Sequence, residues 1–254
     1  MTDIDEDTAR EWLERWEVQQ AGYVPDRNAV FALMGDVIER LAGGPRRIVD
    51  LGCGPGSLSA RLLARFPDAE ITAVDADPVM LALGRATLGY AVRWVSTDLR
   101  DDGWTDAVGV TGADAVVSST ALHWLPADGL AGFCRGVAAL LRPGGVFLDF
   151  DTLLADADDA PRLAGAITDL RRERTEERIR TVREDFAAWW TAIEGEPGLA
   201  GPVAQRAAAT KVGGHGGSTL RQWEDALRGA GFGEVGTVTQ LLDRRLLVAL
   251  RSKT

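Results

Sequence analysis

Between residues 46 and 151 the chain alternates short apolar runs with segments in which apolar residues recur at helical spacing. Five runs have the length and continuous apolar character of buried strands: "RIVDLG", "EITAVDA", "AVRWVSTD", "ADAVVSST" and "VFLDFD". Helices are predicted between them at Ser57–Phe66, Pro78–Thr87 and Gly129–Leu141, the last stopping at "RPGG". Repeated strand–helix units with such strands are typical of a parallel sheet covered by helices on both faces.

The pattern differs on either side of this region. Residues 8–20 are predicted to form a helix, and Asn28 or Asp26 is expected to cap a second one that runs to Leu41. After Asp151 the alternation stops, and residues 152–200 have mainly helical spacing. Their polar stretch 171–178 predicts two helices or one kinked helix.

The end of the chain returns to a strand pattern. A helix capped by Ser218 or Thr219 is expected to run to Arg228, with strands near 234–241 and 244–250. Only Leu242-Asp243 separates these strands, which predicts an antiparallel hairpin at a sheet edge, because parallel neighbours need a long crossover.

These patterns predict an α/β fold with a doubly wound, Rossmann-like sheet. We expect N-terminal helices at 1–44, a core made of 45–151 and 218–254, and a helical insertion at 152–217. The insertion would lie over the carboxyl ends of the strands, where ligands of such sheets bind.

Composition narrows the class of partner. Of 254 residues, 46% are hydrophobic and 26% charged, as in an ordinary soluble protein, and the formal net charge is −10. So acidic a surface disfavours nucleic acid and anionic membranes as partners. The acidic start "MTDIDEDTAR" is unlike a signal peptide, no apolar run is long enough to span a membrane, and two cysteines make neither a disulfide framework nor a zinc site. We therefore expect a cytoplasmic protein.

The strongest chemical signal is the loop "VDLGCGPGSLS" between the first strand and its helix. Glycine allows positive φ and lets backbone N–H groups approach a ligand. The spacing is G-x-G-x-G, with Ser57 where a dinucleotide loop has its third glycine, and Pro55 removes one N–H. A pyrophosphate-bearing dinucleotide is therefore disfavoured, although a nucleotide-binding oxidoreductase stays open as an alternative.

Two acids follow at the ends of the next two strands. Asp75 stands 19 residues after Gly56, the distance at which a doubly wound domain presents an acid to a ribose diol. Asp98 ends the third strand, where a carboxylate can accept a hydrogen bond from an adenine amino group. Either acid alone is as readily explained as a helix cap or a solvated loop residue. Capping explains poorly why both acids and the glycine loop stand at the ends of successive strands.

This combination resembles the class I S-adenosylmethionine-dependent methyltransferases. The resemblance covers about residues 46–151 and is carried by "DLGCGPG" (50–56), Val74-Asp75, Asp98-Leu99, Asp114 to Ser119 and "LRPGG" (141–145). It implies a sheet of order 3-2-1-4-5-7-6 with strand 7 antiparallel. It also implies S-adenosyl-L-methionine as cofactor, S-adenosyl-L-homocysteine as product, and an enzyme that transfers a methyl group.

The resemblance assigns roles to single residues. The glycine loop would pass beneath the methionine and ribose part of the cofactor, Asp75 would hold the ribose hydroxyls, and Asp98 the adenine amino group. Asp50 would fix the methionine amino end together with backbone atoms of Ser118 and Ser119. The cofactor-binding residues expected in this core are Asp50, Gly52, Cys53, Gly54, Gly56, Asp75, Ala76, Asp98, Leu99, Ser118 and Ser119.

The segment "YVPDR" resembles small-molecule methyltransferases of the aconitate methyltransferase-like group. By that resemblance Arg27 would bind the cofactor carboxylate and Tyr23 would cover the pocket; the alternative for Arg27 is an exposed arginine at a helix start. The N-terminal helices would then form a lid and the insertion a cap that binds the acceptor.

His123, in "SSTALHWL", follows the fourth strand and would lie at the mouth of this site as a pocket wall or a general base. His215 is the competing base. The residues expected to line the acceptor pocket are Trp16, His123, Trp124, Phe186, Trp189, Trp190 and His215. For each aromatic residue the alternative is core packing.

Ser118, Ser119 and Thr120 stand where a magnesium-dependent enzyme would want acids, so no metal is expected. A small-molecule acceptor is favoured, with secondary metabolism as one setting for it. The acceptor, the atom methylated and the oligomeric state (monomer or homodimer) stay open, as does an S-adenosylmethionine-binding protein with a non-methylating reaction.

Overall fold

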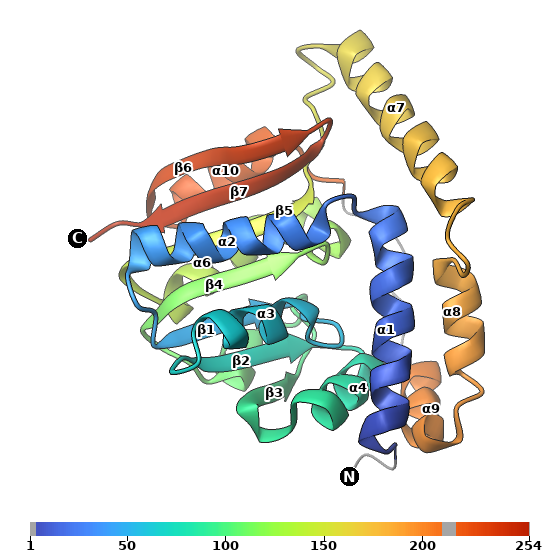
Figure 1. Cartoon of the computed structure of the whole chain (residues 1–254). Coiled ribbons are helices and arrows are strands. Elements are labelled where there is room, and N and C mark those ends of the chain that lie inside the picture. The colour runs from blue at the N-terminus through green and yellow to red at the C-terminus, as the bar shows by residue number, and fades with distance from the viewer. Residues whose placement is uncertain (1–3, 210–216, 254) are drawn as a thin grey trace.

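The computed structural model describes residues 4–209 and 217–253 and contains a seven-stranded sheet of order β3-β2-β1-β4-β5-β7-β6 (Figure 1). Strands β1 to β5 pair in parallel, while β7 runs antiparallel to both β5 and β6. The strands are β1 (Arg47–Leu51), β2 (Glu70–Asp75), β3 (Val92–Ser96), β4 (Ala113–Ser119), β5 (Leu141–Thr152), β6 (Phe232–Leu241) and β7 (Arg244–Arg251). The predicted order and the C-terminal hairpin are confirmed.

Helices cover both faces of the sheet and its carboxyl edge. They are α1 (Glu6–Tyr23), α2 (Arg27–Ala42), α3 (Ser57–Arg65), α4 (Pro78–Leu88), α5 (Trp104–Val108), α6 (Leu130–Leu140), α7 (Pro161–Ile179), α8 (Phe186–Ile193), α9 (Ala200–Ala208) and α10 (Leu220–Gly229). Short 3-10 turns are η1 (Gly89–Ala91), η2 (Leu122–Trp124), η3 (Ala127–Gly129) and η4 (Pro197–Leu199). Thr219 caps α10 in a capping box, as predicted, whereas Asp26 stands at the N-cap of α2 without a side-chain cap bond.

Two boundaries differ from the sequence prediction. The polar stretch 171–178 lies inside the continuous helix α7, so no break occurs there and the chain leaves the helix only after Ile179. Arginine and glutamate are good helix formers, and a polar segment needs no break when it faces solvent. The residues "RPGG" begin β5 rather than a separate turn, because Leu141 already pairs with Ala113 before a register shift.

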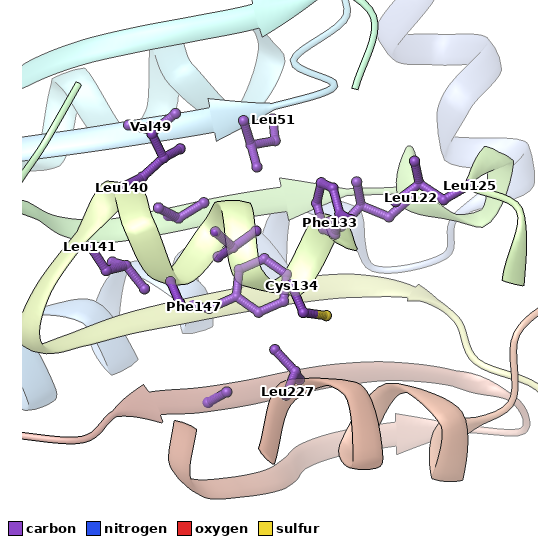
Figure 2. Close-up of a cluster of buried hydrophobic side chains, with 14 of the residues drawn as sticks. Val49, Leu51, Leu122, Leu125, Phe133, Cys134, Leu140, Leu141, Phe147 and Leu227 are labelled. Carbon is purple, nitrogen blue, oxygen red and sulfur yellow. The ribbon is translucent and has the colours of Figure 1, made fainter. Parts of the chain in front are cut away.

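Each face of the sheet carries its own apolar core. On one face Phe147 of β5 packs with Phe133 of α6 and with Leu227 of α10, which is fully buried (Figure 2). On the other face Met34 and Ile38 of α2 pack on the parallel strands. Burying strand side chains on both faces explains the uninterrupted apolar runs.

A third apolar cluster joins the helices at the edge of the sheet. Trp12 of α1 and Trp189 of α8 pack with Val79 and Leu83 of α4. As a result α1 stands across the carboxyl ends of the parallel strands, with α8 on its outer side (Figure 1). This edge is where doubly wound sheets bind ligands. No helix in the described part of the chain is long and apolar enough to cross a membrane.

Candidate active site at the carboxyl edge of the sheet

The glycine loop turns sharply between β1 and α3. Gly52 and Gly54 have φ of +68° and +55°, values that side chains rarely adopt. A Cβ on Gly52 would lie 2.3 Å from the Ala121 Cβ, so packing requires glycine there. A Cβ on Gly54 would meet no atom within 4 Å. Gly54 is therefore the loop position at which the backbone faces open space and can approach a ligand.

Asp75 is held against this loop at the end of β2. Its carboxylate accepts hydrogen bonds from the Gly54 N–H at 2.7 Å and from the Asp77 N–H at 2.8 Å. Burial raises the pKa of Asp75 to about 6, although these two bonds act in the opposite direction. The acid that the spacing singled out thus lies directly beside the open glycine.

Asp50 is fully buried beneath the loop. Burial raises its pKa to about 7; the Ser59 hydroxyl, which donates to the carboxylate at 2.7 Å, offsets part of this effect, and the nearby charge of Asp75 adds to it. Cys53 is also buried, which raises the pKa of its thiol well above the usual value and leaves it a poor nucleophile. Ser118 links the first and fourth strands, since its hydroxyl donates to the Leu51 carbonyl at 2.8 Å.

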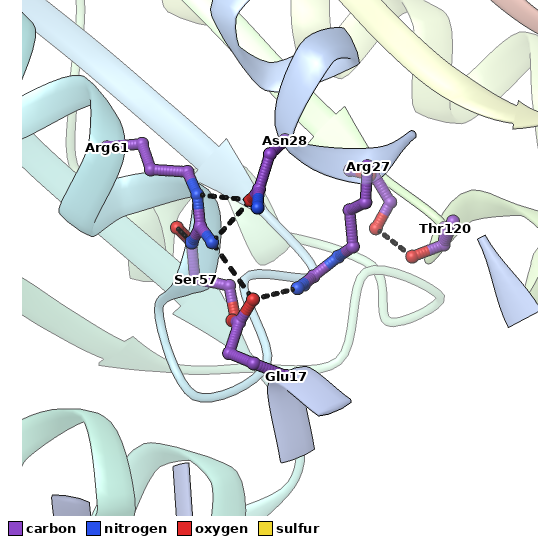
Figure 3. Close-up of polar contacts among 7 residues, drawn as sticks. Glu17, Arg27, Asn28, Ser57, Arg61 and Thr120 are labelled. Atoms are coloured by element: carbon purple, nitrogen blue, oxygen red, sulfur yellow. Dashed lines mark hydrogen bonds and ion pairs between the residues drawn. The ribbon is translucent and has the colours of Figure 1, made fainter. Parts of the chain in front are cut away.

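Arg27 belongs to an ion-pair network that sequence reasoning missed (Figure 3). Its side chain is only 10% exposed, so the alternative of an exposed arginine is wrong. Its Nη1 lies 2.6 Å from Glu17 Oε2, and Arg61 Nη2 lies 3.0 Å from the same oxygen. Burial alone would raise the pKa of Glu17, but the charge of Arg27, a hydrogen bond with the Ser57 side chain and the charge of Arg61 together outweigh burial and hold it below its usual value. The network fixes α1 and α2 over the loop.

Two buried polar atoms around this network have no hydrogen-bond partner among the described residues. They are Arg27 Nε of α2 and Ser119 Oγ at the end of β4. Native proteins leave few such groups unpaired, and each one needs an explanation. A polar ligand placed between α1, α2 and the glycine loop would supply partners.

Asp98, which follows β3, already accepts hydrogen bonds from its neighbour Arg100. Arg100 donates to it through Nε at 2.8 Å and through its backbone N–H at 2.9 Å, and the pKa of Asp98 is lowered by this arginine. Leu99 packs against the core, and Ala76 is exposed at the end of β2. Contact of Asp98 with an adenine stays a prediction, and it requires Arg100 to share the carboxylate.

His123 is paired with Asp151, a partner that sequence reasoning did not identify. His123 Nδ1 lies 2.8 Å from Asp151 Oδ1, and its backbone N–H donates to Oδ2 at 3.0 Å. Asp151 is 2% exposed and ends β5, the strand beside β4. An acid at the end of the strand next to the histidine is the signal that could have found it. Asp149, two residues earlier, is fully buried and has no hydrogen-bond partner in the part of the chain that the structure describes, and burial raises its pKa well above the usual value.

The expected pocket aromatics divide into two groups. Trp16 packs on Trp189 at 5.0 Å and on Phe186 at 6.1 Å, and Tyr23 accepts a hydrogen bond from the Phe186 N–H. Trp189 is fully buried and donates to the Trp12 carbonyl, so its assignment to an open pocket is wrong and it is helix-packing core. Trp190 is half-buried, with the Arg206 guanidinium 3.6 Å above its ring.

The second group lies on η2. Trp124 is 47% exposed, with its ring 5.1 Å from the His123 ring. His215, the competing base, lies outside the described residues. Within the described residues, no group of three or more histidines, cysteines or acids is placed to hold a metal ion.

The order of the strands, the open glycine loop and the acids at the strand ends are together those of the class I methyltransferase fold. Comparison with known proteins places residues 48–145 in a family described as "Methyltransferase domain". A trans-aconitate 2-methyltransferase of Methylobacterium radiotolerans is 33% identical over 160 residues, which are 62% of this chain and 50% of that protein. The chain thus spans about half the length of that curated relative.

Two solved structures share the fold. DesVI of Streptomyces venezuelae has a TM-score of 0.60 at 14% identity and covers 94% of this chain and 98% of its own. Human N-acetylserotonin methyltransferase, solved in complex with S-adenosylmethionine, has a TM-score of 0.54 at 17% identity. The match covers 96% of this chain and 57% of the human chain. Residues 48–145 thus match the methyltransferase domain family, and the chain shares the fold of these solved methyltransferases.

Proposed function

We propose that the protein transfers a methyl group from S-adenosyl-L-methionine to a small-molecule acceptor and releases S-adenosyl-L-homocysteine. The observation that carries this proposal is the pairing of Gly54, whose Cβ position faces open space, with the Asp75 carboxylate held 2.7 Å from its N–H. A carboxylate there can accept from both hydroxyls of a ribose. No feature of the site favours the oxidoreductase or the non-methylating alternative.

The residues around the loop fit such a cofactor. Arg27 would bind its carboxylate, using the buried Nε that no other described residue contacts through a hydrogen bond. Asp50, with the Ser118 and Ser119 backbone, would hold the amino end, and the Ser119 hydroxyl has no partner in the described structure. Ala76, Asp98 and Leu99 would enclose the adenine. When bound, the cofactor supplies an activated methyl group for in-line displacement.

The chain's own contribution to the reaction is alignment, exclusion of water and, for an acidic acceptor group, proton removal. The bond from Nδ1 to Asp151 sets the His123 tautomer in which Nε2 carries the lone pair. In this proposal Nε2 takes the acceptor's proton and Asp151 stabilises the resulting imidazolium. The helices of 1–44 act as a lid and those of 152–217 as the acceptor-binding cap, joined by contacts such as Tyr23 with Phe186.

A small organic acceptor is supported by two observations. The net charge of −10 opposes nucleic acid and anionic membranes. The Methylobacterium relative is named for trans-aconitate, a small carboxylic acid. We include a carboxylic acid among the first acceptors to be tested.

Calorimetric titration with S-adenosylmethionine, S-adenosylhomocysteine and NAD tests the cofactor. We expect the first two to bind and NAD not to bind; binding of NAD alone would refute the proposal. Formation of S-adenosylhomocysteine in the presence of acceptors then tests transfer itself. Tight cofactor binding without turnover on any acceptor would support the non-methylating alternative instead.

A further inference from the structure

A groove of about 220 Å³ lies beside the proposed active site and has no role in the proposed chemistry so far. It runs between the start of α2, the end of β5 and the β6–β7 hairpin. Its lining residues are Pro25, Asp26, Ala29, Val30, Leu33, Phe150, Thr239, Leu241 and Arg244. Most of this wall is apolar, and the volume is below the roughly 300 Å³ at which pockets for drug-sized ligands begin. The groove therefore suits a small metabolite.

Arg244 is the only cation in this lining. The side chain is half-buried, and within the described residues its guanidinium makes no hydrogen bond or ion pair. Burial, followed by the charges of Arg178 and Arg171, lowers its pKa to about 10, although the charges of Asp243 and Asp151 act in the opposite direction. A guanidinium whose pKa is lowered this far lies in an environment that disfavours its charge.

The neighbouring groups do not neutralise it. Arg171 already uses the buried Asp243, at 2.8 Å. Arg178 donates to the Gly22 carbonyl and the Thr175 hydroxyl, which are both neutral. Asp26 lines the groove but is exposed, and within the described chain it makes no ion pair with Arg244. The two acids whose charges reach Arg244, Asp243 and Asp151, already hold Arg171 and His123.

We propose that this groove is an anion subsite in which Arg244 binds a carboxylate or phosphate group of a small molecule. A half-buried cation without a partner is costly, and an anionic ligand would relieve that cost. The planar guanidinium suits bidentate binding of either group, and the apolar wall would cover the rest of the ligand.

The groove adjoins both halves of the proposed active site. Arg244 pairs across the sheet with Thr152, which follows the His123 partner Asp151. On the opposite wall, Pro25 and Asp26 directly precede Arg27. The anion is therefore assigned to the methyl acceptor, and this assignment rests on the proposed function, whereas the subsite itself does not.

Calorimetry on the full chain tests the subsite, with tricarballylate and inorganic phosphate as probes. We expect wild type to bind at least one probe and Arg244→Gln to bind it about tenfold or more weakly, since a charged hydrogen bond is lost. Arg162→Gln, on an exposed face of α7, is the matched control and should bind like wild type. Equal binding by Arg244→Gln and the control, or no binding by wild type, would overturn the subsite.

A second variant covers the case in which Arg244→Gln does not fold. Ala29 is exposed on the groove wall, so Ala29→Trp should fill the groove and abolish anion binding while Arg244 stays in place. Retained anion binding in a folded Ala29→Trp would also overturn the subsite. S-adenosylhomocysteine titrations run in parallel separate the two proposals: anion binding that depends on Arg244 without cofactor binding would uphold the subsite and refute the proposed function.

The acceptor assignment has its own test. If the anion belongs to the acceptor, Arg244→Gln should raise KM for acidic acceptors about tenfold or more and leave cofactor affinity unchanged. An anion bound at Arg244 that neither competes with any methylated acceptor nor alters its KM would overturn the assignment to the acceptor.

Discussion

His123 and Asp151 are joined twice, through the imidazole Nδ1 at 2.8 Å and through the backbone N–H of His123 at 3.0 Å. The carboxylate also accepts from the Thr152 N–H at 2.7 Å, so it is fixed by its own strand while it holds the ring. A buried carboxylate so placed orients the imidazole and favours its protonated form during proton transfer. In the proposed enzyme Asp151 is therefore a positioning residue and His123 the base.

Asp151→Asn should lower kcat about 10- to 100-fold, because a misoriented or wrong-tautomer histidine loses most of a general base's contribution. Acceptor KM should change little, because Asp151 acts on the acceptor only through the histidine. Release of S-adenosylhomocysteine over a range of acceptor concentrations measures both constants. Asp128→Asn, exposed on η3, is the control and should behave like wild type. A kcat in Asp151→Asn equal to that of the control would leave Asp151 a merely structural partner.

His123→Ala separates a base from a pocket wall. A base predicts that kcat falls about 100-fold or more for an acceptor that loses a proton, with acceptor KM changing little. Steady-state kinetics at saturating cofactor measures both constants. If KM rises and turnover at saturation is intact, His123 shapes the pocket and the proton leaves by another route.

Asp75→Ala should weaken S-adenosylhomocysteine binding about tenfold or more, because charge-assisted hydrogen bonds to the ribose are lost. The fold should survive, since the residue ends a strand and its carboxylate accepts from N–H groups of the adjoining loops, those of Gly54 and Asp77. Calorimetry and far-UV circular dichroism give affinity and fold. Asp68→Ala, exposed before β2, is the matched control. Undiminished cofactor affinity would remove the ribose assignment.

Cofactor affinity should depend on pH through the same acids. The pKa values of Asp50 and Asp75 are raised to about 7 and about 6, so the free folded protein keeps protons that unfolded carboxyls lose near pH 4. Ligand hydroxyl and amino groups need the ionised forms, so binding should release protons and weaken as pH falls through 7 and 6. Below each of these pKa values, cofactor affinity should fall by up to about tenfold per pH unit for the carboxyl that must lose its proton.

Calorimetry with S-adenosylhomocysteine from pH 5 to 8 measures this dependence. Asp75→Asn should remove the step near pH 6. Asp98, whose pKa is lowered by Arg100, should contribute no step in this range. Affinity that is constant from pH 5 to 8 would show that neither buried acid must be ionised to bind.

The sequence was sufficient where the determinants are local. Strand runs, the glycine loop and the strand-end acids Asp75 and Asp98 depend on periodicity and short spacing, and β-α-β connectivity then brings their positions to one edge. Partners distant along the chain could not be predicted: Glu17 reaches Arg61 from another helix, and Arg244 meets Arg178 only because α7 returns to the hairpin. Which acid an arginine pairs with, as Arg100 pairs with Asp98, is likewise set by packing in the folded chain.

Exposure was the least predictable property. The spacing of Trp189 and Trp190 fits either a pocket or a core, and only the packing of α1 on α8 decides that Trp189 is buried. The helix α7 shows the converse, since Leu163 and Leu170 form an apolar stripe in sequence yet are 61% and 43% exposed.

The two loop glycines provide a matched pair of substitutions. Gly54→Ala introduces a Cβ into open space at positive φ, so it should cost about 1 kcal/mol of folding stability, the usual penalty for alanine in that conformation. Its methyl group would occupy the surface that the cofactor needs, so S-adenosylhomocysteine affinity should fall about tenfold or more.

Gly52→Ala should affect folding stability more than cofactor affinity. Its Cβ would lie 2.3 Å from Ala121, so overpacking of about 1–3 kcal/mol adds to the backbone penalty and stability should fall further than in Gly54→Ala. Thermal and urea unfolding, with calorimetry on each folded variant, compare the pair. If Gly54→Ala binds the cofactor as wild type does, the open face of the loop is not the binding surface, and the ligand must approach Asp75 from its other side.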